Sequence, residues 1–300
     1  MAARSQAPSA ASSGVEIDAA TGKPTTGHEW DGVKELNQPL PRWWVWTYLA
    51  TVVFAAVYVV LYPAIPMVRS ATTGVLGYST RASVEDGLAA LRAGQAANLE
   101  KIRTLPLTAI RANDDLYRFA VAGGRSAFLV NCVQCHGSGA QGGKGYPNLN
   151  DDDWLWGGSL SAIEKTIQHG IRFAGDPETR AVDMPPFADV LKADDIAAVS
   201  DYVLTLSGQA TSAPLAAKGK PLFADMCSSC HGEKGEGNRD LGAPALKDAV
   251  WLYASDRGAI AAQIAKPRNG VMPAWASRLD AVTIKQLALY VHSLGGGEVE

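Results

Sequence analysis

The segment CVQCH at residues 132–136 recurs as CSSCH at residues 227–231. Two cysteines separated by two residues and followed by a histidine form the attachment motif of c-type haem. One helical turn from the first cysteine to the histidine presents both thiols and the imidazole to one edge and one face of a porphyrin. The sequence therefore predicts two covalently bound haem c groups. The predicted attachment residues are Cys132, Cys135, His136, Cys227, Cys230 and His231.

Zinc sites and redox-active thiol pairs also use cysteines at this spacing. A zinc site built from two C-x-x-C pairs requires no histidine after each pair. A thioredoxin-like redox pair requires a strand–helix–strand context, of which the sequence gives no sign. Two complete C-x-x-C-H motifs at matching places in a repeat favour haem over both.

A methionine followed by proline in each half of the chain is the predicted sixth ligand of the iron. The chain has five methionines. Met1 is the terminus, Met67 adjoins an apolar segment, and Met226 touches a haem cysteine and cannot reach the far face of the porphyrin. Met184 and Met272 remain as candidates. His/Met ligation raises the potential of the iron and suits an electron carrier. Spacing does not decide which methionine serves which haem, because each could ligate within its own repeat or reach across to the other.

The two motifs lie inside a longer internal repeat. Residues 147–156, PNLNDDDWLW, recur as PALKDAVWLY at 244–253, and MPPF at 184–187 recurs as MPAW at 272–275. Two copies are too few for a solenoid, so we expect two tandem globular units, residues 111–210 and 211–300, each closing its own core. Pro147 and Pro244 are candidates to accept a hydrogen bond from the histidine Nδ1–H of their own motif.

The first copy contains about nine extra residues between Trp154 and Met184. Arg172 and Arg180 lie in this insertion and are candidates to bind haem propionates, with simple solvated charge as the alternative. His169 also occurs in the first copy only, and we expect a propionate partner or an ordinary surface residue there.

An uncharged run of twenty residues precedes both units. Residues 43–62 are long enough, at ~1.5 Å per residue, to cross the ~30 Å of bilayer hydrocarbon. Aromatic residues crowd both ends of the run, as in an interfacial belt. A signal peptide would lie nearer the N-terminus and end in a cleavage site. We expect a transmembrane helix at 43–62, preceded by a mobile tail and interfacial segment at 1–42. A linker with one amphipathic helix is expected at 63–110.

Composition excludes several classes of protein. The net charge is −3 and no long basic run occurs, so nucleic acid is not an expected partner. No nucleophile–base pair or phosphate-binding loop stands out, and a methionine-capped haem offers no open site for oxygen or peroxide. The chain is therefore expected to carry electrons and to have no catalytic site of its own. Residues 111–210 carry 8 Lys/Arg and 13 Asp/Glu, which could steer a basic cytochrome or merely be solvated.

The N-terminal region carries a resemblance to a known family. HEWDG at 28–32, the run PLPRWW at 39–44 and LYPAIP at 61–66, together with the two haem motifs, resemble the CcoP/FixP subunit (subunit III) of cbb3-type cytochrome c oxidases. The resemblance covers roughly residues 25–295. It implies an all-α fold with one N-terminal transmembrane helix followed by two tandem cytochrome c domains.

The resemblance also implies a role in respiration. The chain would accept electrons from a periplasmic cytochrome c or from quinol–cytochrome c reductase. Its partners would be a haem–copper catalytic subunit, where oxygen is reduced to water, and a monohaem cytochrome c subunit. Because haem c is attached outside the cytoplasm, the haem units are expected in the periplasm and the chain in the bacterial inner membrane. One alternative is a free-standing membrane-anchored dihaem carrier. Another is a dihaem peroxidase, but the presence of both methionines counts against it, because a methionine-capped haem offers no open site for peroxide.

Overall fold

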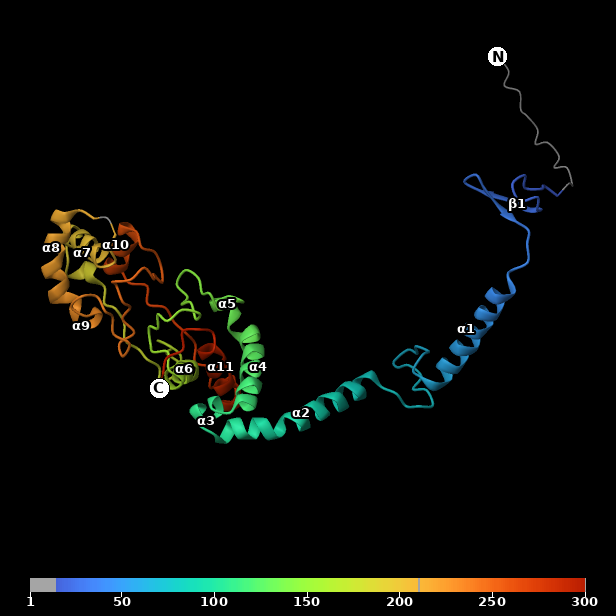
Figure 1. The fold of residues 1–300 in the computed structure, drawn as a ribbon, viewed down its shortest axis with the longest axis horizontal. Helices are drawn as coiled ribbons and strands as arrows, with labels where there is room; N and C mark the ends of the chain where they lie inside the picture. The colour runs from blue at the N-terminus through green and yellow to red at the C-terminus, as the bar shows by residue number, and fades with distance from the viewer. Residues whose placement is uncertain (1–14, 210, 300) are drawn as a thin grey trace, which may run out of the picture. The chain divides into compact units, whose positions relative to one another are not determined.

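The structure is a computed structural model that describes residues 15–209 and 211–299. Residues 1–14 of the predicted tail lie outside the described residues. The chain divides into two compact units, residues 1–91 and 92–300. Figure 1 labels the elements along the chain. They are β1 (Thr25–Trp30), β2 (Val33–Leu36), α1 (Arg42–Leu61), α2 (Thr80–Thr104), α3 (Leu107–Arg111), α4 (Asp114–Asn131), α5 (Val133–His136), α6 (Leu160–His169), the 3₁₀ helix η1 (Phe187–Asp189), α7 (Ala193–Leu206), α8 (Ala213–Met226), α9 (Ser228–His231), α10 (Arg257–Ala265) and α11 (Ala281–His292).

The N-terminal region contains a small antiparallel sheet, so the expectation of an all-α chain is wrong there. β1 pairs with β2, with Glu29 opposite Lys34 and Trp30 opposite Val33. Asp31 and Gly32 between them have φ of 49° and 85°. Positive φ at both central residues is the geometry of a type I′ turn, and Asp-Gly is one of its preferred sequences. The expectation of an unstructured tail fails for residues 15–27 as well, where Ile17 forms a bridge with Pro24.

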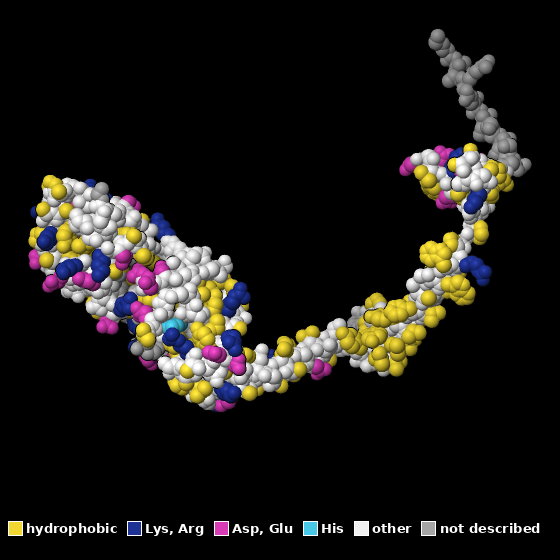
Figure 2. Space-filling view, viewed as in Figure 1, with side chains coloured by type: hydrophobic (Ala, Val, Ile, Leu, Met, Phe, Trp, Pro, Cys, Tyr) yellow, Lys and Arg dark blue, Asp and Glu magenta, His cyan; other side chains and the backbone are white. Residues whose placement is uncertain are grey.

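The apolar run forms one helix, as predicted. α1 has 20 residues, none of them buried, and it is the one helix among the described residues long and apolar enough to cross a membrane. Thr47 and Thr51 donate their hydroxyls to backbone oxygens within the helix, so neither presents an unsatisfied donor. Figure 2 shows apolar side chains covering α1 and the loop that follows it. This loop folds back on the helix end, where Val75 N–H donates to Val60 O.

The linker helix is also found, as α2. Of its predicted apolar stripe, Val84, Leu88 and Leu91 are exposed, and Ile102 is fully buried. The C-terminal end of α2 is held by Lys285 from α11, whose Nζ donates to the carbonyls of Ile102 at 3.2 Å and Arg103 at 3.2 Å, and to Leu105 O at 2.7 Å. A cation at the C-terminal carbonyls of a helix is favoured by the helix dipole.

The second unit contains two hydrophobic cores, and each combines helices from both sequence repeats. One core joins α4 and α6 to α11, and the other joins α7 to α8 and α10 (Figure 1). We call them lobe A (residues 105–171 and 270–299) and lobe B (residues 182–269). The prediction that each repeat closes its own core is therefore wrong. The domain boundaries 111–210 and 211–300 mark the sequence repeat and stay a prediction as domains.

Aromatic pairs in the two lobes make the exchange explicit. In lobe A, Phe128 packs on Tyr290 with ring centroids 5.4 Å apart. In lobe B, Tyr202 packs on Phe223 at 5.2 Å. Phe128 and Phe223 hold equivalent places in the two repeats, and so do Tyr202 and Tyr290. Each pair thus joins the first half of one repeat to the second half of the other.

Glycine allows the same close crossing of helices in both lobes. A Cβ at Gly124 in α4 would lie 2.0 Å from the carbonyl oxygen of Gln286 in α11. A Cβ at Gly219 in α8 would lie 2.0 Å from the carbonyl oxygen of Ala198 in α7. Any larger residue would push the helices apart. These crossings bring the helix that precedes each C-x-x-C-H motif onto a helix from the other repeat.

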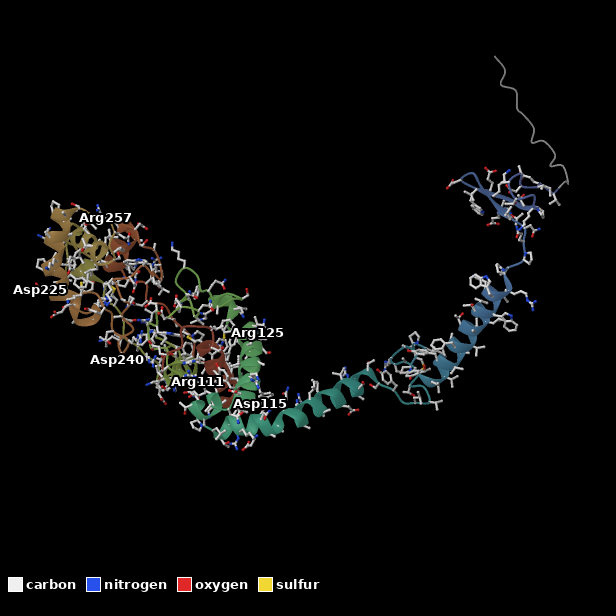
Figure 3. All side chains as sticks on the ribbon, in the orientation of Figure 1. Arg111, Asp115, Arg125, Asp225, Asp240 and Arg257 are labelled. Carbon is white, nitrogen blue, oxygen red and sulfur yellow. The ribbon has the colours of Figure 1, made fainter. Side chains whose placement is uncertain are left out.

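Charge is spread over both lobes as a result. Seven of the thirteen acidic residues at 111–210 lie beyond residue 171, and five of those seven lie in lobe B. Figure 3 labels charges of both signs on each lobe: Arg111, Asp115 and Arg125 on lobe A, and Asp225, Asp240 and Arg257 on lobe B. The sequence-based picture of one acidic unit for docking a basic cytochrome therefore does not describe either lobe.

Candidate haem-binding sites

Each C-x-x-C-H motif forms one helical turn after a bend at its first cysteine. Cys132 ends α4 with φ −111° and ψ −25°, and Cys227 ends α8 with φ −115° and ψ −30°. The backbone N–H of His136 then donates to Cys132 O at 3.0 Å, and that of His231 donates to Cys227 O at 2.9 Å. The two motifs thus have the same local geometry, with both cysteines and the histidine on a single turn.

A glycine follows each histidine and lets the chain turn away. Gly137 and Gly232 both have φ of 79°, in the left-handed region that other residues rarely adopt. The chain then returns, and Gly142 N–H donates to His136 O while Gly237 N–H donates to His231 O, both at 2.8 Å. The glycine-rich stretch after each motif therefore serves backbone geometry.

The histidine Nδ1 atoms have the partners that the sequence indicated. His136 Nδ1 lies 3.1 Å from Pro147 O, and His231 Nδ1 lies 3.0 Å from Pro244 O. A carbonyl only accepts, so Nδ1 carries the proton and Nε2 is the free ligand nitrogen. Burial lowers the pKa of both histidines, and the weaker effect of the proline carbonyls opposes it. Neutral imidazole, the form that binds metal, is therefore favoured.

The cysteines are free thiols with unequal exposure. Burial, with a smaller contribution from the neighbouring thiol, raises the pKa of Cys132 and of Cys227 to about 11. Cys135 is exposed and Cys230 is half-buried. Each motif thus has a protonated inner thiol and a more accessible outer thiol, and no disulfide links them.

Met184 and the second motif face one cavity in lobe B, although they belong to different repeats. The cavity has a volume of about 500 Å³, and its lining is mostly apolar. Its wall includes Cys227, Cys230 and His231 together with Met184 and Trp251. Two thiols, an imidazole and a thioether around a space of this size are the donor set of a haem c with His/Met ligation.

Met272 occupies the equivalent place in lobe A. It packs against the lobe A core, as do Cys132, Val133 and Trp154 from the first repeat. Its backbone pairs with Ile171, with N–H···O distances of 2.9 Å and 3.0 Å in the two directions. Trp275, three residues further on, donates its backbone N–H to Ile167 O at the end of α6. The second-repeat methionine is thereby tied to the first repeat and shares a core with Cys132.

The insertion of the first repeat lies between the two lobes in the chain. Arg172 lines the lobe B cavity, and Arg180 instead donates to Trp156 O at 3.0 Å and Thr166 Oγ1 at 2.9 Å. Both guanidinium groups stack on Trp156, each 5.5 Å from the ring centroid. Arg172 therefore has the better position to face a haem in lobe B.

His169 belongs to a local ion-pair cluster. Its Nδ1 lies 3.2 Å from Asp176 Oδ2, and its Nε2 lies 3.6 Å from Glu178 Oε2. Both partners come from the insertion, which explains why this histidine has no equivalent in the second repeat. A structural role in fixing the insertion accounts for it.

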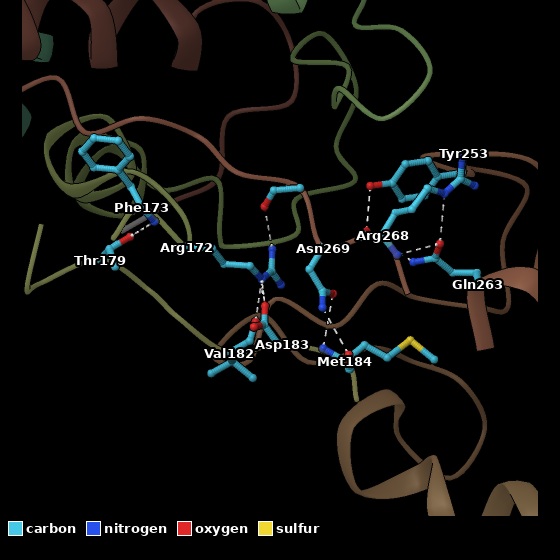
Figure 4. Close-up of polar contacts among 11 residues, drawn as sticks. Arg172, Phe173, Thr179, Val182, Asp183, Met184, Tyr253, Gln263, Arg268 and Asn269 are labelled. Carbon is cyan, nitrogen blue, oxygen red and sulfur yellow. Dashed lines mark hydrogen bonds and ion pairs between the residues drawn. The ribbon is translucent and has the colours of Figure 1, made fainter. Parts of the chain in front are cut away.

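One contact residue escaped the sequence analysis. Asn269 accepts from Met184 N–H at 3.4 Å and donates to Met184 O at 3.2 Å (Figure 4). It lies in the second repeat, three residues before Met272, whereas Met184 belongs to the first repeat. No local motif marks this position, and only the packing of one repeat against the other shows which methionine it contacts.

Comparison with known proteins identifies relatives over nearly the whole chain. The family model described as cytochrome c oxidase, cbb3-type, subunit III matches residues 119–203 and 214–291. That of the N-terminal domain of cytochrome oxidase-cbb3, FixP, matches residues 22–69. The cbb3-type cytochrome c oxidase subunit FixP of Sinorhizobium medicae is 55% identical over 283 residues, covering 94% of this chain and 98% of the relative. Subunit CcoP of Cereibacter sphaeroides is 50% identical over 277 residues, covering 92% and 96%.

Proposed function

The chain belongs to the family of cbb3-type cytochrome c oxidase subunit III and is an electron-transfer component of that oxidase, and from this premise we propose that it carries two haem c groups with exchanged methionine ligands. One would be attached to Cys132 and Cys135, with His136 and Met272 as axial ligands. The other would be attached to Cys227 and Cys230, with His231 and Met184. The observation that carries the pairing is the shared cavity of Met184 and the second motif.

The residues of each site would divide the task of holding the iron. The cysteines fix the macrocycle to the chain, and the proline carbonyls orient the histidines through Nδ1. The methionine loops hold a weak thioether ligand in place by backbone contacts to the opposite repeat. Bound haem c would supply a reversible one-electron iron couple, and thioether ligation raises its potential.

The wider role follows from family membership and the N-terminal helix. We propose that α1 spans the bacterial inner membrane and that the haem lobes lie in the periplasm. Electrons would arrive from a periplasmic cytochrome c or from quinol–cytochrome c reductase. They would leave toward the haem–copper catalytic subunit, with the monohaem cytochrome c subunit as a further partner in the complex.

Single-haem variants test the exchanged pairing. Cys227→Ala with Cys230→Ala should leave only the haem at the first motif. In that background Met272→Ala should abolish the absorption band of methionine-ligated ferric haem, whereas Met184→Ala should preserve it. The reciprocal background, Cys132→Ala with Cys135→Ala, should reverse the two results. Loss of the band with the methionine of the same repeat would overturn the pairing.

A further inference from the structure

Arg172 contacts both chain segments that deliver a methionine. Its Nε donates to Val182 O at 2.8 Å and lies 2.7 Å from Asp183 Oδ1, immediately before Met184. Its Nη1 donates to Gly270 O at 3.2 Å, two residues before Met272 (Figure 4). The side chain of Arg172 is 17% exposed, so water competes little for these contacts.

The residues around Arg172 extend the same link. Ile171, its neighbour, already holds the backbone of Met272 by two hydrogen bonds. Asn269, next to Gly270, holds the backbone of Met184 by two more. Arg172 therefore joins two local anchors, each of which by itself contacts one methionine.

The backbone of Arg172 is unusual. Its φ of 52° lies in the left-handed region, which is strained for a residue with a side chain. Such a conformation persists only where the surroundings impose it. Here the backbone N–H of Arg172 donates to Arg180 O at 2.8 Å, and the side chain makes the three contacts to the methionine segments.

We propose that Arg172 is a positioning residue that holds Met184 and Met272 on their two irons through one side chain. The inference rests on the exchanged ligation of the proposed function. Its consequence is that a single substitution outside both C-x-x-C-H motifs loosens the sixth ligand of both haems. The polar contacts of the Arg172 side chain go to Val182, Asp183 and Gly270, so it acts through the segments that carry the methionines.

Imidazole is a probe for this effect, because it binds ferric haem only where the methionine has left. Its apparent affinity therefore rises in proportion to the fraction of sites from which the methionine has left. Removing a charge-assisted hydrogen bond that closes the site should raise that fraction about tenfold. Arg172→Gln should consequently bind imidazole about tenfold more tightly at both haems. Binding is measured in the holoprotein as the loss of the absorption band of methionine-ligated ferric haem.

Two variants control for charge and for location. Arg180→Gln removes a guanidinium stacked on the same Trp156 at the same 5.5 Å, yet Arg180 donates to Trp156 and Thr166 instead of the methionine segments. It should leave both imidazole affinities unchanged. Asn269→Ala should raise the affinity only at the haem attached to Cys227 and Cys230. Methyl resonances of the two ligating methionines, followed by NMR, resolve the sites.

Arg172→Lys provides the test if the Gln variant does not mature. A lysine keeps the charge but lacks the planar fork that reaches both segments. Arg172→Lys should therefore still loosen both methionine ligands and raise the imidazole affinity at both haems. Unchanged imidazole affinity at both haems, or a change at one haem alone, would overturn the inference. If Arg180→Gln raised the imidazole affinities equally, the effect of Arg172→Gln would be due to loss of charge and not to positioning of the methionine segments. A parent protein without any methionine-dependent band would instead overturn the proposed ligation itself.

Discussion

Lobe A and lobe B share one architecture but are closed by connections of very different length. The two crossing helices of lobe B, α7 and α8, are joined by residues 207–212, whereas α4 and α11 of lobe A have residues 132–280 between them. Lobe B is thus one continuous segment, inserted into a lobe A that is made from both flanks. The difference teaches that the sequence repeat and the folded lobe are different units of this molecule.

The lobes also differ in their buried polar groups. Asp201 in lobe B is fully buried, and its Oδ1 accepts from Arg257 at 2.6 Å and from Ser212 N–H at 2.8 Å. Its Oδ2 has no hydrogen-bond partner among the described residues. The equivalent position in the second repeat is Leu289, an apolar residue of the lobe A core. The lobe with the shorter connection therefore carries a buried carboxylate paired with an exposed arginine.

Excision of lobe B is the strongest test of this comparison. Residues 172–269, exported to the periplasm, should fold and bind one haem, because they contain α7, α8, α10, Met184 and the second motif. Residues 211–300, a complete sequence repeat, should not give a stable haem protein, because α11 would lack its partner α4. Haem content and circular dichroism of the two fragments measure the result. A stable repeat fragment with an unfolded lobe fragment would refute the exchange.

A double-mutant cycle tests the exchange in the intact chain. Phe128→Ala should destabilise lobe A by about 3–5 kcal/mol, because it removes a fully buried ring. Phe128→Ala and Tyr290→Ala should be coupled by ~0.5–1.5 kcal/mol, as expected for an aromatic pair in contact. The matched cycle of Phe128→Ala with Tyr202→Ala, within one repeat, should show additive losses in thermal unfolding. Coupling in the second cycle only would contradict the structure.

The ion pair of the buried Asp201 with Arg257 should matter in lobe B alone. Arg257→Gln leaves the buried carboxylate of Asp201 without its charged partner and should cost about 2 kcal/mol. The loss should appear as faster amide exchange in α7 and α10, while α4 and α11 keep their protection. Equal loss of protection in both lobes would mean that they unfold as one cooperative unit.

The smallest expected effect is a pH dependence in the acidic loop of lobe A. Burial, and then the neighbouring carboxylate of Asp248, raise the pKa of Asp153 above its ordinary 3.8. A carboxyl whose pKa is raised in the folded state favours folding at pH values below its ordinary pKa. This contribution to stability is lost as the pH rises through the pKa of the folded state. Asp153→Asn should therefore stabilise the protein at pH 7 by a few tenths of a kcal/mol, on the order of other half-exposed charges.

The control for this effect is the same comparison in acid. Below about pH 3 the carboxyl of Asp153 is protonated in both the folded and the unfolded state, so the parent protein and Asp153→Asn should unfold at the same denaturant concentration. A stabilisation that persists unchanged in acid would assign the effect to something other than charge.

The sequence by itself located the candidate haem residues of this protein and its long apolar helix. The two C-x-x-C-H motifs, the proline carbonyls and the Met-Pro segments are local signals, because each follows from a fixed spacing along one helix or loop. The apolar run at 43–62 was found as α1 within one residue at each end. The hairpin at Asp31-Gly32 was missed, although Asp-Gly is itself a local turn signal.

Only the tertiary structure decided which halves pack together. Phe128 and Phe223 are equivalent, as are Tyr202 and Tyr290, so the apolar pattern satisfies either pairing equally well. The choice between the two pairings depends on the lengths of the segments that connect the helices. A six-residue link favours packing of α7 on α8, because a short loop loses less entropy on closure, and α4 is then left to α11. The partners of Met184 and Met272 follow from that choice, which no spacing within one repeat encodes.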